Sequence, residues 1–359
     1  MEQTATPKGD AMAALPQLAG GLFLSDGGLE TSLIYLDGID LPQFAAFPLA
    51  ENEAGRAQLE RYYRPYLELA AATPGAGYVL ETPTWRASAD WGASLGCDAG
   101  RLAAVNRSAA LWLHGLRREW QARIAGPIVL AGIIGPRGDG YIADAPDSAE
   151  AAAAFHRVQA AALAEGGVDM LCAVTMTTSA EALGVANAAA AFHPPQAAAL
   201  AEGGVDMLCA VTMTTSAEAL GVANAAAAVG VPVSISFTVE TDGRLPNGEA
   251  LRDAIERVDA EAAVAPAYFG INCAHPSHFD AVFADGGAWA SRIQSLRANA
   301  SARSHAELDA ATELDIGDLP DLADRYRRLR APLPRLNVLG GCCGTDHRHL
   351  RAIRDAWLR

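Results

Sequence analysis

Two adjacent cysteines, Cys342 and Cys343, follow a pair of glycines at the end of the apolar run Asn337–Leu339. A third cysteine, Cys273, ends a second run, Tyr268–Asn272. Glycines let the backbone turn sharply at the end of a strand and bring thiols to the edge of a pocket. Three cysteines are three soft ligands, and a catalytic zinc ion is held by three protein ligands and one open position. The pattern predicts a zinc site on these three cysteines.

The three ligands are far apart in the sequence. The gap between Cys273 and Cys342 greatly exceeds the local spacing of a zinc finger, so tertiary structure has to bring the thiols together. The alternative is that they are buried thiols that only fill a core. We expect that simpler role for Cys97, Cys172 and Cys209.

Composition restricts the possible partners. The chain has 359 residues, 51% of them hydrophobic, and a formal net charge of -15. This charge repels phosphate backbones and anionic lipids, so we expect neither nucleic acid nor a membrane as a partner. No run reaches the roughly 18 apolar residues of a membrane span, and the first twenty residues lack the layout of a signal peptide. We expect a cytoplasmic enzyme of small molecules with reduced cysteines. The sequence does not determine its oligomeric state.

Apolar runs that end in glycine or polar residues alternate with helix-forming stretches along the chain. Eight such runs are expected to be strands: Leu22–Ser25, Tyr78–Leu80, Ile128–Ala131, Val168–Ala173, Val231–Phe237, Tyr268–Asn272, Arg292–Leu296 and Leu336–Leu339. Eight strand–helix units predict an α/β fold, a (β/α)8 TIM-type barrel with its active site at the carboxyl ends of the strands. A doubly wound open sheet is the alternative. We expect residues 1–20 to form a flexible leader and residues 21–359 a single barrel domain.

A near-exact 37-residue tandem duplication interrupts this pattern around the fourth strand. Residues 151–187 recur as residues 188–224, with Arg157-Val158 replaced by Pro194-Pro195. Two near-identical copies indicate a local duplication rather than a solenoid. The second copy offers a ninth strand, Val205–Ala210, but strand number and tilt are linked in a closed barrel. We therefore expect one copy, preferably the second, in the wall and the other to be surplus, as a helical excursion.

Three segments resemble the signatures of the homocysteine S-methyltransferase family, in the family's order. They are Asp26–Thr31, Gly270–Cys273 and Gly340–Thr345, and the resemblance covers the chain from about Leu22 to its end. It implies a zinc-dependent barrel that transfers a methyl group to the thiol of homocysteine, giving methionine. By motif position, Zn2+ would be bound by Cys273, Cys342 and Cys343.

The implied chemistry has a physical basis. A free thiol has a pKa of about 8.5 and is mostly protonated at neutral pH, whereas a thiol that coordinates zinc is deprotonated. An acceptor thiol in the open zinc position would be a thiolate, able to attack a methyl group on a positively charged sulfur or nitrogen. S-methylmethionine, S-adenosylmethionine and betaine are all candidate donors. No catalytic residue beyond the metal site is required.

Further residues are candidates for substrate binding. The resemblance places Asp26 and Gly27 beside the amino acid, where the carboxylate could accept hydrogen bonds from its ammonium group. Glu81 and Trp85 follow the second strand and could line the donor pocket, with the indole facing a cationic methyl group. The remaining candidates are Asn272, beside the ligand loop, and Asn299, in a stretch that loosely resembles a Pro-Asn-Ala segment of the family. For each, a cap, a salt bridge or simple packing is the alternative. Three histidines near the thiols, His275, His347 and His349, are candidates to support the metal ligands.

The sequence departs from the family at one substrate position. Many members have a Glu-Thr pair at the end of the fourth strand, and the glutamate holds the substrate amine. Here the position reads Val174-Thr175, repeated as Val211-Thr212. Glu81 could compensate, or the acceptor could be another small thiol. Two alternative functions stay open: another zinc-dependent lyase or hydrolase on the same barrel, and a metal-binding relative without catalytic activity.

Overall fold

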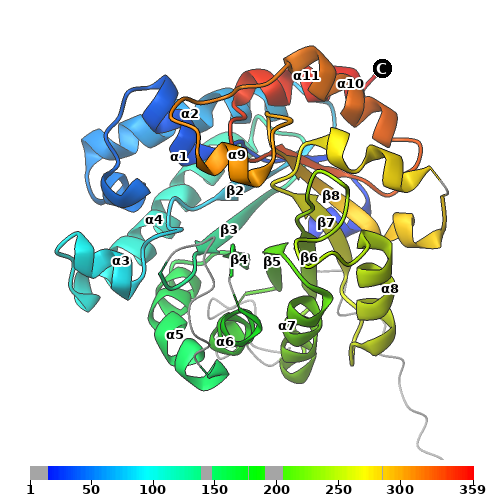
Figure 1. Cartoon of the computed structure of the whole chain (residues 1–359). Helices are drawn as coiled ribbons and strands as arrows, with labels where there is room; N and C mark the ends of the chain where they lie inside the picture. Colours follow the sequence, from blue (N-terminus) through cyan, green and yellow to red (C-terminus); the bar gives the residue numbers. More distant parts are fainter. Residues whose placement is uncertain (1–14, 139–147, 177, 191–204, 285) are drawn as a thin grey trace, which may run out of the picture.

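The strands form one closed parallel barrel, and the helices surround it (Figure 1). The structure is a computed structural model that describes residues 15–138, 148–176, 178–190, 205–284 and 286–359. Each strand pairs in parallel with the strand before and after it in the sequence, and the last strand pairs with the first. The predicted α/β barrel is confirmed, and the open-sheet alternative is excluded by this closure.

The described strands and helices follow the predicted alternation. The strands are β1 (Phe23–Leu24), β2 (Gly77–Glu81), β3 (Ile128–Ile134), β4 (Met170–Val174), β5 (Met207–Met213), β6 (Val233–Phe237), β7 (Tyr268–Asn272), β8 (Ile293–Ala298) and β9 (Val338–Gly341). The helices are α1 (Leu29–Thr31), α2 (Glu53–Ala71), α3 (Ala89–Ser94), α4 (Ala99–Gln121), α5 (Ala149–Glu165), α6 (Ser179–Ala190), α7 (Ser216–Val229), α8 (Leu251–Glu261), α9 (His305–Asp309), α10 (Leu319–Leu329) and α11 (His347–Trp357). Short 3-10 and π turns complete the connections.

The duplication adds a strand to the wall, which differs from the expected eight strands and one surplus copy. β4 comes from the first copy and β5 from the second, and equivalent residues are paired, as in Met170↔Met207 and Cys172↔Cys209. Both strands have the same inward and outward residues, so both bury their apolar faces in the barrel. An extruded copy would leave an apolar strand without hydrogen-bond partners. Pro194-Pro195, which we expected to break a long helix, lies outside the described residues.

The last helix of the first copy packs closely against its neighbour. α6 lies between α5 and α7 below the strands (Figure 1). Gly184 of α6 faces Ala152 of α5, where a Cβ atom on the glycine would lie 2.4 Å from the alanine Cβ. Its counterpart in the second copy, Gly221, has nothing within 4 Å of that position. Identical sequence therefore packs differently in the two copies, because each copy has different neighbours.

Side chains fill the barrel in the alternating pattern of a β-strand. Inward residues such as Val79, Val129 and Met170 form one buried cluster, and outward residues such as Leu80 and Leu171 pack under the helices in another. This alternation follows from the twofold period of a strand.

The start of the described chain closes the amino-terminal end of the barrel. Residues 1–14 of the expected leader lie outside the described residues. Pro16–Ala19 forms a short 3-10 helix, and Leu15 and Gln17 are buried. The Asn337 amide donates hydrogen bonds to the carbonyl oxygens of Gln17 at 2.8 Å and Gly21 at 2.9 Å. The packed domain therefore begins before residue 21.

Within the described residues, none of the helices combines the length and the apolar character needed to cross a lipid bilayer.

Candidate active site

The three predicted zinc ligands meet at the carboxyl end of the barrel. Cys273 directly follows β7, and Cys342 and Cys343 directly follow β9. The turn after β9 is fixed to the end of β8, because the Cys342 amide donates to the Ala298 carbonyl at 2.8 Å and the Ala300 amide donates to the Cys343 carbonyl at 3.0 Å. Parallel strands thus bring together thiols that are distant in the sequence.

The three thiols are free and in mutual contact. The Sγ atoms of Cys273 and Cys342 are 2.8 Å apart, and those of Cys342 and Cys343 are 4.0 Å apart. Hydrogen bonds from the Cys342 and Cys343 thiols, with a further one from the Asn272 amide, lower the pKa of Cys273 well below its ordinary value. The same contact raises the pKa of Cys342 to about 12. One thiolate is therefore stabilised by two thiols that donate to it.

The donor set suits zinc in type, and its geometry needs a small adjustment. Two sulfurs on one tetrahedral zinc ion are about 3.8 Å apart, because each Zn–S bond is about 2.3 Å long. The Cys342–Cys343 separation matches this value, whereas the Cys273 and Cys342 sulfurs would have to separate by about 1 Å. As positioned, no group of three or more His, Cys, Asp or Glu side chains in the described chain is arranged to hold a metal ion.

A hydrogen-bond network fixes Cys273 at the end of β7. The Asn272 amide nitrogen donates to its Sγ at 3.1 Å and to the Thr212 hydroxyl at 2.7 Å, while the Asn272 oxygen accepts from the Thr212 backbone amide at 2.9 Å. The Cys273 carbonyl accepts from Asn299 at 2.8 Å and contacts the His305 Nε2 at 2.6 Å. Asn272, a candidate for substrate binding, thus contacts the thiol directly, and Asn299 contacts the backbone of Cys273.

Unusual backbone angles occur at the ends of three strands. Cys273, Thr212 and Thr175 have positive φ values of 55°, 66° and 58°. Non-glycine residues in this region cost energy and are held there by their surroundings. For Thr212 and Cys273 the network around Asn272 provides that restraint.

Glycines at the two signature loops allow these loops to interlock. A Cβ atom on Gly27 would lie 2.5 Å from the Thr345 carbonyl oxygen, and one on Gly341 would lie 2.0 Å from the Thr345 hydroxyl. The Gly28 amide donates to the Thr345 carbonyl at 3.0 Å. Gly27, predicted to border the substrate, therefore also holds the first signature loop against the loop that carries Cys342 and Cys343.

A buried arginine joins the two acidic candidates. Arg297, near the end of β8, donates to both carboxylate oxygens of Glu81 and to Asp26 Oδ1, the last at 3.2 Å. Tyr62 donates to Asp26 Oδ2 at 3.2 Å. The side-chain exposures of Arg297, Glu81 and Asp26 are 19%, 14% and 4%, so these charges interact with little screening by water.

The group has two carboxyl groups and a single arginine. Burial, and then the charge of Glu81, raise the pKa of Asp26 well above its usual range, against the opposing effect of Arg297. Burial alone would lower the pKa of Arg297, but Glu81 and Asp26 hold it above its ordinary value. Glu30 lies in the same signature loop as Asp26, and burial raises its pKa to about 7. A cationic ligand group beside Asp26 would favour the ionised form of its carboxyl group.

Arg297 and Tyr62 were not among the sequence candidates. Arg297 lies one residue beyond the predicted strand Arg292–Leu296. Glu81 was selected because it is a charged residue at the end of a strand, and the same criterion would have selected Arg297. Tyr62 lies on α2 among other buried tyrosines, and nothing in its local sequence distinguishes it.

The aromatic candidate Trp85 is held by other contacts. Its indole nitrogen donates to the Thr175 hydroxyl at 3.2 Å. The Arg86 guanidinium lies 4.7 Å from the centre of its ring. One face of the indole thus already contacts a cation of the protein.

The three histidines near the thiols contact other parts of the protein. His275 caps a short 3-10 helix, with Nδ1 2.8 Å from the Ser277 hydroxyl. His349 contacts Asp346 at the start of α11 and the Ile316 carbonyl. His347 lies against the Tyr66 ring. In the described part of the chain, His305 is the histidine in contact with a cysteine of the site, through the Cys273 carbonyl.

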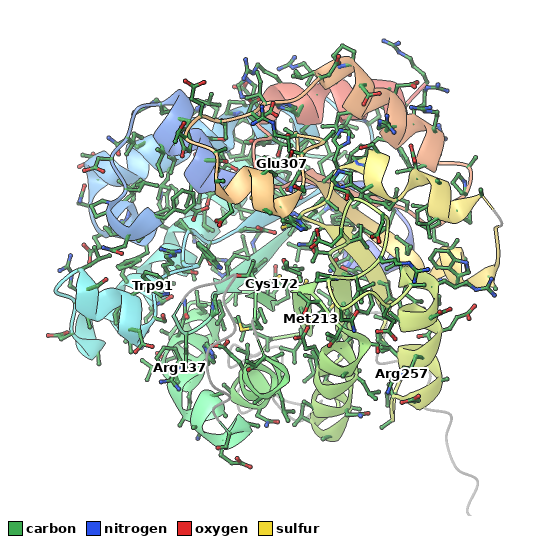
Figure 2. The ribbon with its side chains drawn as sticks, in the orientation of Figure 1. Trp91, Arg137, Cys172, Met213, Arg257 and Glu307 are labelled. Carbon is green, nitrogen blue, oxygen red and sulfur yellow. The ribbon has the colours of Figure 1, made fainter. Side chains whose placement is uncertain are left out.

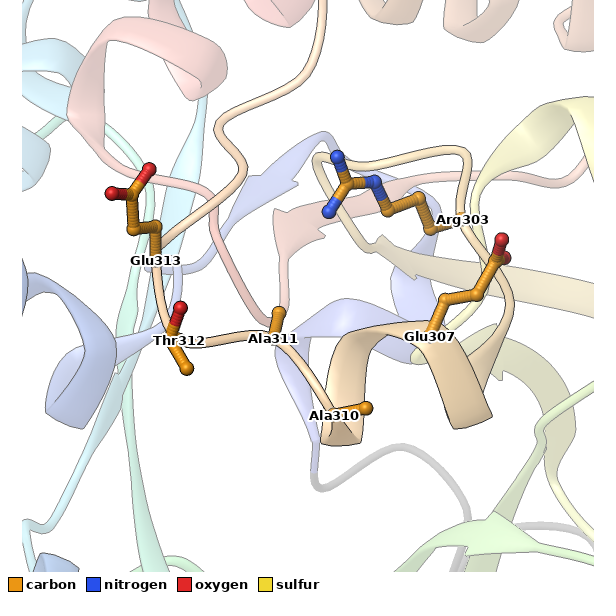
Figure 3. Close-up of a pocket in the computed structure, with 6 residues that line it drawn as sticks. All are labelled: Arg303, Glu307, Ala310, Ala311, Thr312 and Glu313. Carbon is orange, nitrogen blue, oxygen red and sulfur yellow. The ribbon is translucent and has the colours of Figure 1, made fainter.

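A surface hollow of about 550 Å³ lies in the segment that follows β8. It is lined by Arg303, Glu307 and residues 310–313, beside α9 (Figure 3). None of the three cysteines, nor Asp26 or Glu81, contributes to its lining. The hollow is therefore separate from the thiols.

Comparison with known proteins agrees with this architecture. A model of the homocysteine S-methyltransferase family matches residues 23–191 and 185–357. The first match runs through the first repeat copy and the second begins just before the second copy, as expected of a duplicated segment. No curated protein sequence matches the chain.

Solved structures show a similar fold. The homocysteine methyltransferase MmuM from Escherichia coli, in its oxidized and metallated forms, is 20% identical over 96% of this chain and 99% of that chain, with a TM-score of 0.62. Its apo form gives a TM-score of 0.57. The two matches of the family model together cover nearly all of the barrel. The chain belongs to the homocysteine S-methyltransferase family, whose members are enzymes that transfer a methyl group to homocysteine.

Proposed function

We propose that the chain methylates homocysteine, giving methionine, with a zinc ion held by Cys273, Cys342 and Cys343 and a cationic compound as the methyl donor. The observation that carries the proposal is the convergence of three thiols beside the Asp26, Glu81 and Arg297 group at one end of the barrel. When bound, zinc would supply the positive centre that keeps an acceptor thiol deprotonated at neutral pH.

The charged group would bind the ammonium and carboxylate groups of the acceptor. The ammonium group would approach Asp26 and Glu81 and favour the ionised form of Asp26, and the carboxylate would approach Arg297. Asn299 is 4% exposed and its Oδ1 atom has no hydrogen-bond partner, so it is a further acceptor for the ammonium group. Asp26, Glu81 and Asn299 would take the place of the family glutamate, which is replaced by Val174 and Val211.

The transfer balances without a general base on the protein. The electron pair of the acceptor sulfur forms the new S–CH3 bond while the bond from the methyl carbon to the positively charged sulfur or nitrogen of the donor breaks. The donor leaves as a neutral sulfide or amine, and the acceptor's proton passes to solvent. S-methylmethionine, S-adenosylmethionine and betaine each meet this requirement.

The primary test measures zinc content and loss of homocysteine thiol with each donor in turn. We expect about one zinc per chain and thiol loss with at least one donor, and neither in Cys342→Ser. Cys97→Ser, which changes a thiol remote from the signatures, serves as the matched control. Equal zinc content in the Cys342→Ser variant and the native protein would refute the metal site.

A second measurement tests recognition of the amine. 4-Mercaptobutanoate is homocysteine without its ammonium group, and we expect Glu81→Gln to raise KM for homocysteine at least tenfold while leaving KM for this analogue nearly unchanged. An equal change for both thiols would show that Glu81 does not contact the amine.

The replaced family glutamate favours one other candidate, a metal-binding relative without catalytic activity. Val174 and Val211 offer no charge to a substrate. Bound zinc with no thiol loss for any of the three donors would identify this case.

A further inference from the structure

The loop that carries Cys273 is bordered by a histidine and a glutamate from two other elements. His305 is the first residue of α9, and Glu240 lies in the loop after β6. The His305 Nδ1 atom is 3.1 Å from Glu240 Oε1, and its Nε2 atom is 2.6 Å from the Cys273 carbonyl oxygen. The His305 ring thus joins the ends of β6 and β7 to the start of α9.

The contact with Cys273 has a defined direction. A carbonyl oxygen can only accept a hydrogen bond, so Nε2 of His305 carries the hydrogen and donates. The Thr238 hydroxyl lies 3.5 Å from the same nitrogen. Because Nε2 faces Cys273 and Nδ1 faces Glu240, the two nitrogens together hold the ring in one orientation.

The backbone on both sides of the ring is itself fixed. Glu240 begins a turn in which its amide donates to the Arg244 carbonyl at 2.8 Å. Ser304 and Glu307 form a capping box at the start of α9, the helix on which Glu307 is labelled in Figure 2. A side chain held by ordered backbone positions its partner more precisely than one on a loose segment, so His305 is well placed to brace the Cys273 loop.

Cys273 needs such a restraint because of its own backbone conformation. Its φ value of 55° is costly for a residue other than glycine. Its carbonyl accepts from Asn299 at 2.8 Å and from His305 at 2.6 Å, which uses both lone pairs of the oxygen. Its amide donates to the Arg297 carbonyl at 3.1 Å. These contacts fix the peptide groups on both sides of Cys273, and thereby the direction in which its side chain leaves the backbone.

We propose that His305, oriented by Glu240, is a positioning residue for Cys273 as a zinc ligand. The inference rests on the proposed function, because the metal is the zinc ion of that site. His305 supplies no ligand atom, since its nitrogens face the Cys273 carbonyl and Glu240, and it acts through the backbone of the ligand. Loss of residues that orient metal ligands typically weakens metal binding by about 10- to 100-fold.

Competition with a zinc chelator tests this role in the full-length protein. We expect His305→Ala to weaken zinc binding by about tenfold or more, and His305→Gln, whose amide nitrogen can reach the same carbonyl, to recover most of the loss. His278→Ala is the matched control, because His278 Nε2 lies 2.9 Å from the Ala302 carbonyl, a similar contact outside the metal site. Equal zinc affinities in His305→Ala and His278→Ala would overturn the proposal.

A double-variant cycle tests the part assigned to Glu240. We expect Glu240→Ala to weaken zinc binding by a smaller factor than His305→Ala. The double variant should bind zinc as His305→Ala does, because Glu240 acts only through the ring. Additive losses would show that Glu240 acts independently of His305 and would overturn this part of the proposal.

Two further readouts separate positioning from general loss of structure. The side chains of His305 and Glu240 are 34% and 39% exposed, so we expect nearly unchanged thermal unfolding of the metal-free variants. Cobalt(II) bound in place of zinc reports the ligand geometry through its visible absorption. We expect this spectrum to change in His305→Ala and to match the native one in His305→Gln. A native protein without zinc would refute the proposed function and this inference together, whereas unchanged affinity and spectrum in His305→Ala would refute the inference alone.

Discussion

At the scale of single residues, Arg297 is the largest addition that the structure makes to the sequence-based site. It is the shared partner of two buried carboxylates, Asp26 and Glu81. Removing one member of a buried ion pair leaves the opposite charge without compensation. Arg297 is therefore required for stability as well as being a candidate to bind the substrate carboxylate.

We expect Arg297→Met to lower the free energy of unfolding by roughly 3–5 kcal/mol, the cost of leaving buried charges unpaired. Urea unfolding at pH 7 measures this loss. Arg252→Met is the matched control, because Arg252 pairs with Glu256 on the exposed side of α8; it should change stability by less than about 0.5 kcal/mol. Equal losses in the two variants would contradict the importance of the buried group.

The duplication provides a matched pair of residues to test the support of the metal ligands. Thr212 of the second copy contacts Asn272 and Cys273, while its counterpart Thr175 accepts a hydrogen bond from Trp85. Loss of residues that orient metal ligands typically weakens binding by about 10- to 100-fold. We expect Thr212→Ala to weaken zinc binding at least tenfold and Thr175→Ala to leave it nearly unchanged, measured by competition with a zinc chelator. The opposite order would assign the support to the first copy.

At the scale of the elements, contact between a helix and a loop changes the pKa of a histidine outside the candidate site. His114 of α4 lies against the loop before β4, with Nε2 2.6 Å from the Gly167 carbonyl and Nδ1 2.8 Å from Arg117 Nη2. Burial lowers the pKa of His114 from its ordinary value of 6.5, and the nearby Arg117 adds to the effect. The neutral ring, which donates to Gly167 and accepts from Arg117, is the form that fits.

The sign of the pH dependence follows from this lowered pKa. Below pH 6.5 the unfolded chain binds a proton at His114 before the folded chain does, so this contribution to stability is lost as the pH falls. We expect the native protein to lose more unfolding free energy than His114→Gln between pH 7.5 and 5, measured by urea unfolding at each pH. Parallel pH profiles for the two proteins would show that the histidine makes no contribution.

At the scale of the whole molecule, the two copies of the repeat make a barrel of nine strands. Deleting residues 188–224 joins Asn187 to Ala225 and restores the sequence that already follows the second copy. β4 would then lie next to β6, and Thr175 would take the place of Thr212 beside Asn272. The shorter chain would have the eight strands that the sequence pattern outside the duplication predicts.

We expect the deletion variant to unfold cooperatively, to bind zinc as the native protein does and to keep its methyl transfer within a few-fold. Circular dichroism, metal analysis and thiol loss measure these properties. A variant that aggregates or lacks zinc would show that the ninth strand is needed to build the site.

The sequence by itself determined which segments are strands and which end of the barrel carries the candidate site. Both kinds of information are local: a strand is marked by a short apolar run, and Cys273, Cys342 and Cys343 each follow one. The same reasoning located Asp26, Glu81 and Asn272, which all lie at or just after strand ends.

Tertiary structure alone decided the number of strands, the partners of Arg297 and the burial of Gln17 beneath the barrel. Closure of a barrel depends on the tilt and hydrogen bonding of all strands together, so no single segment specifies whether one repeat copy or both enter the wall. In the same way, Arg297 meets Asp26 and Glu81 only because β8, β1 and β2 end on one side of a closed sheet.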